Sequence, residues 1–443
     1  MRWRRTGPGD TNAIYDANHD GTDIDRNEES ESQMMRTTKL KTMMLAVTGM
    51  LSMGPIGAQT HRLTAEDAED GYARPRFQLY SNPDFSALAT TGPTGLSPAA
   101  VRHFYGHDLI TNTGSGQIIA IVTAFDSPNA EKDLGTFSTN YKLTACTTAN
   151  GCFKKIYAAG TVPPVDATWA LETALDVQWA HAIAPAAKIY LVEAKSSSNT
   201  DLLAAVDVAV SNGANVVSMS FGGAEYAAQI NDDVHFNKLN ITFVAASGDT
   251  GYGAEYPSSS PYVLAVGGTT VVLGTGNVYG SETAWSGSSG GQSKYDLIPA
   301  YQSGLPVPSS NGYRAIPDVS FDANPASGFA VYDSTAYGGA TGWFQVGGTS
   351  AGAPQWAGLA AIVNSMRLAA GKKVLGATAT SRINNLIYLL GATATYANNY
   401  HDVTSGTNGT CGTLCTAVTK YDYVTGLGTP KANTLINSLV AQP

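Results

Sequence analysis

Short apolar runs alternate with longer segments of helical periodicity along residues 96–443. The runs are rich in β-branched residues and are apolar at successive positions, so both faces of each strand are expected to be buried. Strands of this kind are typical of a parallel sheet. The predicted strands span residues 117–123, 188–193, 215–220, 241–246 and 262–266.

Three segments between and after these strands have the apolar spacing of helices. Residues 167–183 end before a proline, residues 200–211 end before a glycine, and residues 356–366 carry a long apolar face with Pro354 in the first turn. Because strands and helices alternate, the pattern predicts βαβ units and an α/β fold with a mostly parallel central sheet.

The chain before residue 96 lacks the pattern of a folded domain. Residues 1–33 are charged, and we interpret them as an extension upstream of the true start at Met34 or Met35. Residues 34–58 combine a basic start, an apolar stretch and small residues, which predicts a secretory signal peptide. Residues 59–95 are rich in Pro, Gly, Ser and charge and predict a linker or an extended N-terminal wrap.

The composition narrows the class of protein. The 443 residues are 43% hydrophobic, enough for a sizeable core, but only 14% are charged, against roughly 25% in an average domain. With a net charge of -9 and no basic stripe, the chain is not expected to bind nucleic acid. No later apolar run reaches the roughly 20 residues needed to span a bilayer, so we expect a secreted protein that does not interact with the membrane.

The four cysteines fall into two local pairs, Cys146 with Cys152 and Cys411 with Cys415. Neither pair has the spacing or the nearby histidine of a zinc site. Two short-loop disulfides are therefore expected, which fits an oxidising compartment.

Ser350 lies among small residues, in the segment Gly347-Gly348-Thr349-Ser350-Ala351-Gly352, directly before the third helix. Small neighbours let a substrate backbone approach, and a helix N terminus stabilises negative charge on an attacked carbonyl oxygen. The segment thus predicts a nucleophile. A helix N-cap is the alternative, since serine often has that role.

Three acids accompany this serine. Glu172 and Asp176 lie four residues apart, on one face of the predicted helix 167–183. Where water is excluded, such a pair shares a proton, which raises the pKa of one carboxyl and makes it a general base and acid; a solvated acidic face is the alternative. Asp249 follows the strand 241–246, at the edge where α/β sheets bind ligands, although an acid between glycines is also typical of a turn.

Taken together, these segments resemble the sedolisins, the serine-carboxyl peptidases with a subtilisin-like fold, over about residues 94–440. Further matching segments are Gly-Leu-Ser-Pro at 95–98, residues 216–222 and residues 262–269. The resemblance implies a mostly parallel central sheet with helices on both faces, and a secreted monomeric endopeptidase that hydrolyses protein or peptide substrates through an acyl-enzyme. This chain differs from the family in one respect. Sedolisins are usually made with a large N-terminal prodomain, whereas only about 36 residues separate Ala58 from Gly95 here.

The resemblance also implies the role of each site residue. Ser350 would be the nucleophile, Glu172 its base, Asp176 the acid that orients Glu172, and Asp249 the acid of the oxyanion hole. A carboxylate base works near its own pKa, and Asp249 must be protonated to donate a hydrogen bond, so we expect an optimum below about pH 5. Glu255 lies where relatives carry a residue near the substrate pocket and is expected to favour basic side chains, or else to lie on the surface.

Residues 401–428 resemble the calcium loop of the same family. One structural Ca²⁺ would be held by carboxylates and backbone carbonyls, the oxygen ligands this cation prefers. The two carbonyl positions 418 and 420 are usually glycine in the family. The implied ligands are Asp402, Val403, Val418, Lys420 and Asp422.

Three other functions compete with this interpretation. A subtilisin-type peptidase would use an Asp-His-Ser triad, with Asp126 and one of the seven histidines, but no supporting histidine segment is visible. An inactive secreted binding protein on the same scaffold would explain the missing prodomain. A glycosidase with Glu172 and Asp176 as its carboxyl pair would leave Ser350 and Asp249 without a role.

Overall fold

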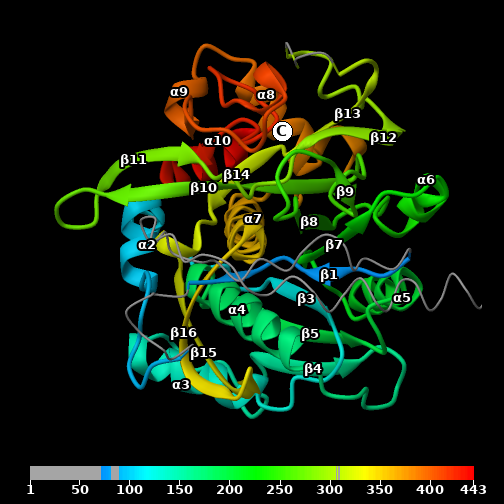
Figure 1. Ribbon diagram of the computed structural model, residues 1–443. Helices are drawn as coiled ribbons and strands as arrows, with labels where there is room; N and C mark the ends of the chain where they lie inside the picture. The colour runs from blue at the N-terminus through cyan, green and yellow to red at the C-terminus, as the bar shows by residue number, and fades with distance from the viewer. Residues whose placement is uncertain (1–70, 81–88, 306, 308–309) are drawn as a thin grey trace, which may run out of the picture. The chain divides into compact units, whose positions relative to one another are not determined.

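The computed structural model describes residues 71–80, 89–305, 307 and 310–443, all within one compact unit, Ala58–Pro443. The predicted extension, signal peptide and first part of the linker lie outside the described residues. The structure is shown in Figure 1.

Eight strands form the central sheet. They are β3 (Ile118–Ala124), β4 (Phe153–Tyr157), β5 (Lys188–Ala194), β6 (Val216–Met219), β8 (Thr242–Ala246), β10 (Val263–Leu273), β11 (Tyr279–Ala284) and β14 (Val319–Asp322). Their order is β11-β10-β8-β6-β3-β5-β4, with β14 also paired to β10. Every pair is parallel except β10 with β11, so the predicted mostly parallel sheet is confirmed.

Both faces of this sheet are buried, as the apolar runs predict. Along β3, Ile119 and Ile121 belong to the apolar cluster that includes α4 (Ala167–Ile183) and α7 (Gly352–Ala369). The alternating residues Ala120 and Val122 belong to the cluster that includes α5 (Asn199–Ser211). Because side chains alternate along a strand, α5 covers one face of the sheet while α4 and α7 cover the other (Figure 1).

Local chemistry sets the ends of these helices. At the start of α4, Asp166 caps the helix by accepting hydrogen bonds from the backbone N–H of Thr168 and Trp169. Ser198 caps α5 in the same way. The remaining helices are α2 (Pro98–Tyr105), α3 (Ala130–Tyr141), α6 (Gln229–Asp232), α8 (Ile383–Gly391), α9 (Tyr396–Asn399) and α10 (Ala432–Ala441).

One strand runs further than its sequence pattern indicates. The predicted strand ends at residue 266, whereas β10 continues to Leu273 and there pairs with β11 and β14. Gly267 and Gly268 interrupt the apolar run without ending the strand. The minor strands are β1 (Arg74–Pro75), β2 (Gln78–Leu79), β7 (Phe221–Ala224), β9 (Glu255–Tyr256), β12 (Gly291–Leu297), β13 (Tyr313–Ile316), β15 (Phe329–Tyr337), β16 (Ala340–Gly347), β17 (Tyr400–His401) and β18 (Thr429–Pro430).

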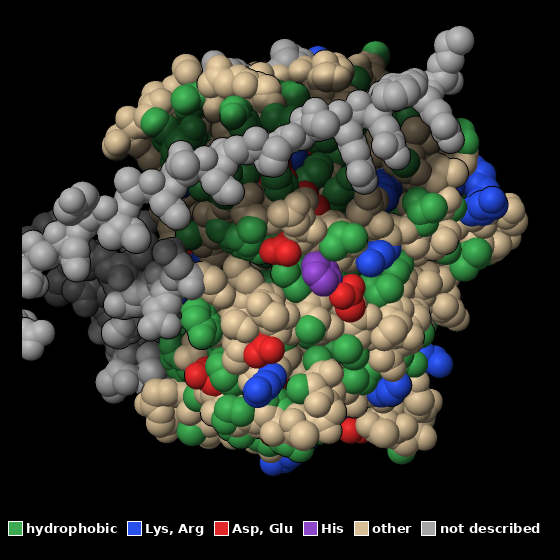
Figure 2. All heavy atoms as spheres, turned by 90° about the vertical axis from the view of Figure 1, so that its right-hand side faces the viewer, with side chains coloured by type: hydrophobic (Ala, Val, Ile, Leu, Met, Phe, Trp, Pro, Cys, Tyr) green, Lys and Arg blue, Asp and Glu red, His purple; other side chains and the backbone are tan. Residues whose placement is uncertain are grey.

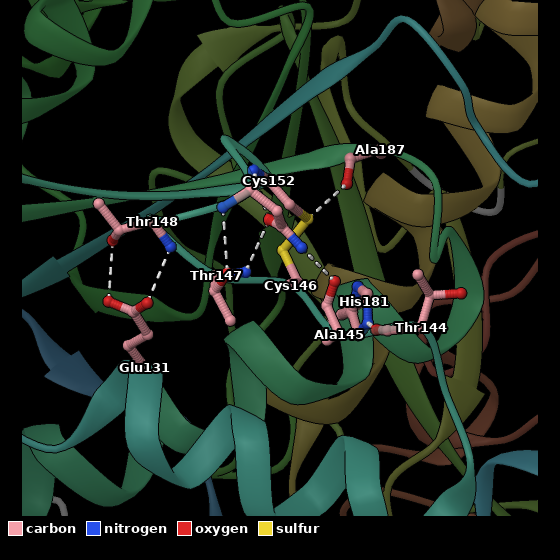
Figure 3. The surroundings of a disulfide bond; sticks show 10 residues. Glu131, Thr144, Ala145, Cys146, Thr147, Thr148, Cys152, His181 and Ala187 are labelled. Atoms are coloured by element: carbon pink, nitrogen blue, oxygen red, sulfur yellow. Dashed lines mark hydrogen bonds between the residues drawn. A yellow bond between two sulfur atoms is a disulfide. The ribbon is translucent and has the colours of Figure 1, made fainter.

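Both predicted disulfides are present. Cys146 and Cys152 close the loop that leads into β4, and Cys411 is bonded to Cys415. Figure 3 shows His181 beside the first disulfide, where its Nε2 bonds to the carbonyl oxygen of Thr144 at 2.7 Å. Because the two sulfurs are bonded to each other, this cluster of two cysteines and a histidine offers no thiolate to a metal ion.

The surface carries few charges in the view of Figure 2. On the described part of this face, acidic and basic side chains stand singly or in small mixed groups among polar and apolar atoms. Of the helices that the structure describes, none combines the length and apolar character needed to cross a membrane.

Candidate active site

Ser350 lies in the short 3-10 turn Thr349–Ala351, which connects β16 to α7. The side chain is buried, and its Oγ donates a hydrogen bond to Oε2 of Glu172 at 2.8 Å. The cap position of α7 is Ala351, which makes no side-chain capping bond. The N-cap interpretation of Ser350 is therefore wrong.

Glu172 and Asp176 lie on the buried face of α4, and 1% or less of each residue is exposed. The solvated acidic face is therefore excluded. Burial and the neighbouring charge of Asp176 raise the pKa of Glu172 well above its usual range, and burial raises the pKa of Asp176 as well. Oδ1 of Asp176 accepts a hydrogen bond from the hydroxyl of Ser220 at 2.6 Å.

Asp249 follows β8 and lies against the turn that carries Ser350. Its Oδ1 accepts hydrogen bonds from the backbone N–H and the hydroxyl of Thr349, at 2.8 and 2.7 Å. Its Oδ2 is buried and has no hydrogen-bond partner among the described residues. Burial raises the pKa of Asp249 to about 7, so below neutrality this oxygen carries a proton that is available for donation.

A carbonyl oxygen lies beside this acid. It belongs to Arg76, and it accepts the backbone N–H of Ser350 at 2.9 Å. A Cβ added at Gly348, where φ is +99°, would come within 2.4 Å of this oxygen and 2.5 Å of Oδ2 of Asp249. Only glycine leaves room there for both groups, which explains the glycine at position 348.

Arg76 belongs to a segment that runs through the cleft. β1 pairs antiparallel with β7 (Figure 1), and β2 pairs antiparallel with β16. Between these two strands, the backbone N–H of Arg76 lies 3.1 Å from the carbonyl oxygen of Ser220 and 3.0 Å from Oε2 of Glu172. This segment covers the predicted site residues on one side.

Glu255 lies in the same cleft, buried rather than on the surface. Its Oε2 lies 2.7 Å from Nε of Arg76 and forms an ion pair with it. Gly222 and Gly248 form the walls, because a Cβ at either position would come within 2.6 Å of the Glu255 carboxyl group. The backbone of Arg76 thus contacts Ser350, while its side chain reaches the carboxyl group of Glu255.

Three residues of the site were not assigned a role from the sequence. Ser220 and Thr349 lie within segments that were singled out, but nothing distinguished them there from ordinary strand and turn residues. Arg76 lies in the stretch predicted as a linker or wrap, and it has no local signal, since its position depends on strand pairing with β7 and β16.

The residues of the predicted calcium loop lie close together. The two acids, however, contact backbone N–H groups of the residues whose carbonyl oxygens were predicted as ligands. Asp402 accepts the backbone N–H of Lys420 at 2.9 Å, and Asp422 accepts that of Val418 at 3.2 Å. A cation requires carbonyl oxygens at these two positions, not N–H groups. In the described conformation the two acids are therefore bonded to N–H groups of the loop, and the calcium site stays a prediction.

The histidines do not form the alternative triad among the described residues. Asp126 is paired with Lys155, and His181 bonds to a backbone carbonyl. The hydrogen bonds of Ser350 Oγ go to Glu172 and to the carbonyl oxygen of Ser220. The side chain that accepts the hydrogen bond of the Ser350 hydroxyl is thus a carboxyl group and not an imidazole.

Comparisons with known proteins point to one family. The model of the subtilase family matches residues 166–401. Kumamolisin from Bacillus sp. (strain MN-32) is 30% identical over 415 residues, which cover 83% of this chain and 68% of that protein. Sedolisin from Pseudomonas sp. (strain 101) is 30% identical over 365 residues, which cover 75% of this chain and 57% of that protein.

A solved structure gives the same result. Pseudomonas sedolisin, a serine-carboxyl proteinase complexed with two molecules of pseudo-iodotyrostatin, matches with a TM-score of 0.65 and 27% identity. The match covers 78% of this chain and 98% of that chain. The fold, the carboxyl group bonded to a buried serine and these similarities together show that the chain belongs to the subtilase family and, within it, to the sedolisins, the serine-carboxyl peptidases.

Proposed function

We propose that this protein is a secreted endopeptidase that hydrolyses peptide bonds at acid pH, with Ser350 as nucleophile. The observation that carries this proposal is the hydrogen bond of 2.8 Å from Ser350 Oγ to the buried carboxyl group of Glu172. A serine hydroxyl is a weak nucleophile unless a base takes its proton, and Glu172 is the group in position to do so.

The reaction follows from the contacts of each group. Glu172 takes the hydroxyl proton as Ser350 Oγ attacks the substrate carbonyl, and it returns the proton to the leaving amine as the acyl-enzyme forms. The negative charge on the attacked oxygen is stabilised by the backbone N–H of Ser350 and by the protonated Oδ2 of Asp249. Water then releases the acyl group by the same steps in reverse.

Asp176 acts on Glu172 rather than on the substrate. Its charge, four residues away on α4, raises the pKa of Glu172, so the two carboxyl groups share one proton over a wide pH range. The hydrogen bond from Ser220 holds Asp176 in place. We assign Asp176 as a positioning residue.

Both carboxyl roles favour acid conditions. Asp249 donates only while it is protonated, so this contribution is present at low pH and is lost as the pH rises through about 7. Glu172 accepts a proton only while the pair with Asp176 is not fully protonated, so activity also falls at the lowest pH. The two requirements together predict that activity follows a bell-shaped dependence on pH, with its maximum below neutrality.

The proposal is tested by an assay on a quenched peptide or denatured casein from pH 2 to 8, with Ser350→Ala and Glu172→Gln beside the wild type. We expect activity at acid pH that both substitutions abolish. Equal activity in the three proteins would reject the assigned roles. An inactive wild type that folds normally would favour the alternative of a binding protein on the same scaffold.

The other predictions for this chain remain open to direct tests. Secretion after cleavage near Ala58 is checked by N-terminal sequencing of protein from the medium, and the monomeric state by light scattering. The calcium ion also stays a prediction.

A further inference from the structure

Thr349 directly precedes the proposed nucleophile, and both of its hydrogen-bond donors contact Asp249. Its backbone N–H donates to Oδ1 of Asp249 at 2.8 Å, and its hydroxyl group donates to the same oxygen at 2.7 Å. Both residues are buried. One residue of the Ser350 turn therefore holds a single oxygen of this carboxyl group with two hydrogen bonds.

The hydroxyl group of Thr349 is itself oriented by the backbone of Gly248. The N–H of Gly248 donates to Oγ1 of Thr349 at 3.1 Å. The carbonyl oxygen of Gly248 is another acceptor for the hydroxyl proton at 3.2 Å, a longer contact than the 2.7 Å to Asp249. Because a hydroxyl group has one proton, the shorter contact to the carboxyl group is the preferred one.

These contacts determine which oxygen of Asp249 can carry a proton. The two hydrogen bonds from Thr349 use both lone pairs of Oδ1, so this oxygen has none left for a proton of its own. Oδ2 is buried and has no hydrogen-bond partner among the described residues. A Cβ built at Gly348 would come within 2.5 Å of Oδ2 and of the oxygen that accepts the N–H of Ser350. The free oxygen of the acid thus faces the oxyanion position.

We propose that Thr349 is a positioning residue of the oxyanion site: its bonds to Oδ1 leave Oδ2 as the oxygen of Asp249 that donates to the attacked carbonyl oxygen. The inference rests on the proposed function, and it adds a residue that acts through Asp249 and does not touch the substrate. Because Thr349 precedes Ser350 in the same turn, one segment fixes both oxyanion donors, the N–H of Ser350 and Oδ2 of Asp249. Donors that are already in place need no reorganisation when the charge develops.

The hydroxyl group of Thr349 also affects the pH at which Asp249 loses its proton. Burial raises the pKa of Asp249 to about 7, and the hydrogen bonds from Thr349 act against this rise because they favour the ionised carboxyl group. Of the charged groups nearby, Arg76 lowers this pKa and Glu255 raises it, while Glu172 is the neighbouring acid of the catalytic site. Without the hydroxyl group, Asp249 should remain protonated to a higher pH.

The test compares Thr349→Val with the wild type, because valine has the shape of threonine without its hydroxyl group. kcat and KM for a quenched peptide are measured from pH 3 to 9. We expect kcat at pH 4 to fall about tenfold with little change in KM, a smaller loss than that of a complete oxyanion donor. The alkaline limb of kcat/KM should move upward by about one pH unit, as expected when one hydrogen bond to the ionised carboxyl group is lost. Damage to the turn alone would lower kcat without this shift.

Two variants are the controls. Thr349→Ser keeps the hydroxyl group and should restore both kcat and the alkaline limb to the wild-type values. Thr429 of β18 is a matched residue outside the Ser350 turn, because it is buried and its hydroxyl group donates to the buried carboxyl group of Glu282. Thr429→Val should leave kcat and the alkaline limb unchanged.

A double-mutant cycle shows whether Thr349 acts through Asp249. Thr349→Val is introduced into Asp249→Ala, which has no carboxyl group to position. In this background we expect Thr349→Val to lower kcat by less than about twofold, against about tenfold in the wild type. An equal loss in both backgrounds would show that Thr349 acts independently of Asp249, and it would refute the inference.

The outcomes separate the two proposals. If the wild type hydrolyses the peptide and Thr349→Val keeps both its kcat and its alkaline limb, the role of Thr349 is refuted while the peptidase function stands. Thr349→Ala gives the same comparison if valine prevents folding, because alanine also removes the hydroxyl group and is smaller. If the wild type is inactive, or if Ser350→Ala is equally active, the proposed function is wrong and this inference fails with it.

Discussion

Two pairs of buried acids in this molecule both have raised pKa values, but they contact different groups. Glu172 and Asp176 lie on one helix, while Asp133 of α3 faces Asp333 of β15. In both pairs the pKa is raised chiefly by burial, and that of Asp333 reaches about 7 with a further contribution from the charge of Asp133. Raised pKa values therefore do not by themselves identify an active site.

The two pairs differ in the groups that donate hydrogen bonds to their carboxyl oxygens. Asp133 and Asp333 accept backbone N–H groups of Ser334 and Thr335, so this pair joins a helix to a strand. Glu172 instead accepts a hydroxyl at the start of a helix, beside a carbonyl held by a second N–H donor. The proposed nucleophile and oxyanion site next to Glu172 distinguish this pair from the structural one.

The largest effect is expected when the catalytic pair loses its base. Glu172→Gln cannot take the proton of Ser350, so kcat should fall by about 10³-fold or more, within the range of general base catalysis at its upper end. Asp333→Asn, a matched loss of one buried carboxyl, should leave kcat within about twofold. The measurement is hydrolysis of a quenched peptide at pH 4 by each purified protein.

Comparable losses in Glu172→Gln and Asp333→Asn would contradict this distinction, because they would indicate damage to folding rather than to chemistry. Circular dichroism of both variants serves as the control. A loss of the circular dichroism signal in either variant would show that the substitution has disturbed the fold.

The second effect concerns the oxyanion acid. Asp249→Asn keeps a donor but removes the titration, and the expected loss is about 10²-fold, typical of a disturbed oxyanion hole. In the wild type kcat/KM should decline as the pH rises through about 7, where Asp249 loses its proton. The variant should lack this decline, and an unchanged alkaline limb in Asp249→Asn would assign it to another group.

The third effect is on stability and involves the structural pair. Asp333 has a raised pKa in the folded state, so its favourable contribution is complete below about pH 4 and is lost as the pH rises through about 7. Asp333→Asn should therefore match the wild type at pH 4 and exceed it at pH 8 by on the order of 4 kcal/mol in the free energy of unfolding.

Urea unfolding at the two pH values measures this difference. A variant less stable than the wild type at pH 8 would show that the Asp333 carboxylate, once ionised, is stabilised by its backbone donors more than it is opposed by burial. Glu193, whose pKa burial raises to about 8, should add to the same loss of wild-type stability in alkali.

Much of the fold was predictable from the sequence, and the comparison explains which parts of the site were too. The apolar runs predicted the strands because both faces of the sheet are buried. The spacing of Glu172 and Asp176 predicted a buried acid pair because one helix carries both residues. Asp133 and Asp333 are 200 residues apart in the chain, so no local pattern joins them.

The contacts of Arg76 were out of reach for the same reason. Its partners, Glu255 and Ser350, follow it by more than 170 residues, and its own neighbours resemble a linker. Ser220 was equally hidden, since a serine at the end of a buried strand is common and only the folded chain places its hydroxyl against Asp176.

The smallest effect is expected at the predicted calcium loop, whose acids resemble the structural pair more than the catalytic one. Asp422 accepts the backbone N–H groups of Val424 and Thr425, so its charge is already compensated within the loop. Calcium at 1 mM should therefore raise the free energy of unfolding by only about 1.4 kcal/mol relative to a chelator, as expected for roughly tenfold excess over Kd.

Thermal unfolding with calcium or with chelator measures this gain, and Asp402→Asn should remove it. A protein that unfolds outright in chelator would mean that the loop reorganises around the ion, with the carbonyls of Val418 and Lys420 turned inward. If calcium changes the unfolding temperature of neither protein, the backbone N–H groups bonded to Asp422 alone stabilise this loop, and the ion has no part in its stability.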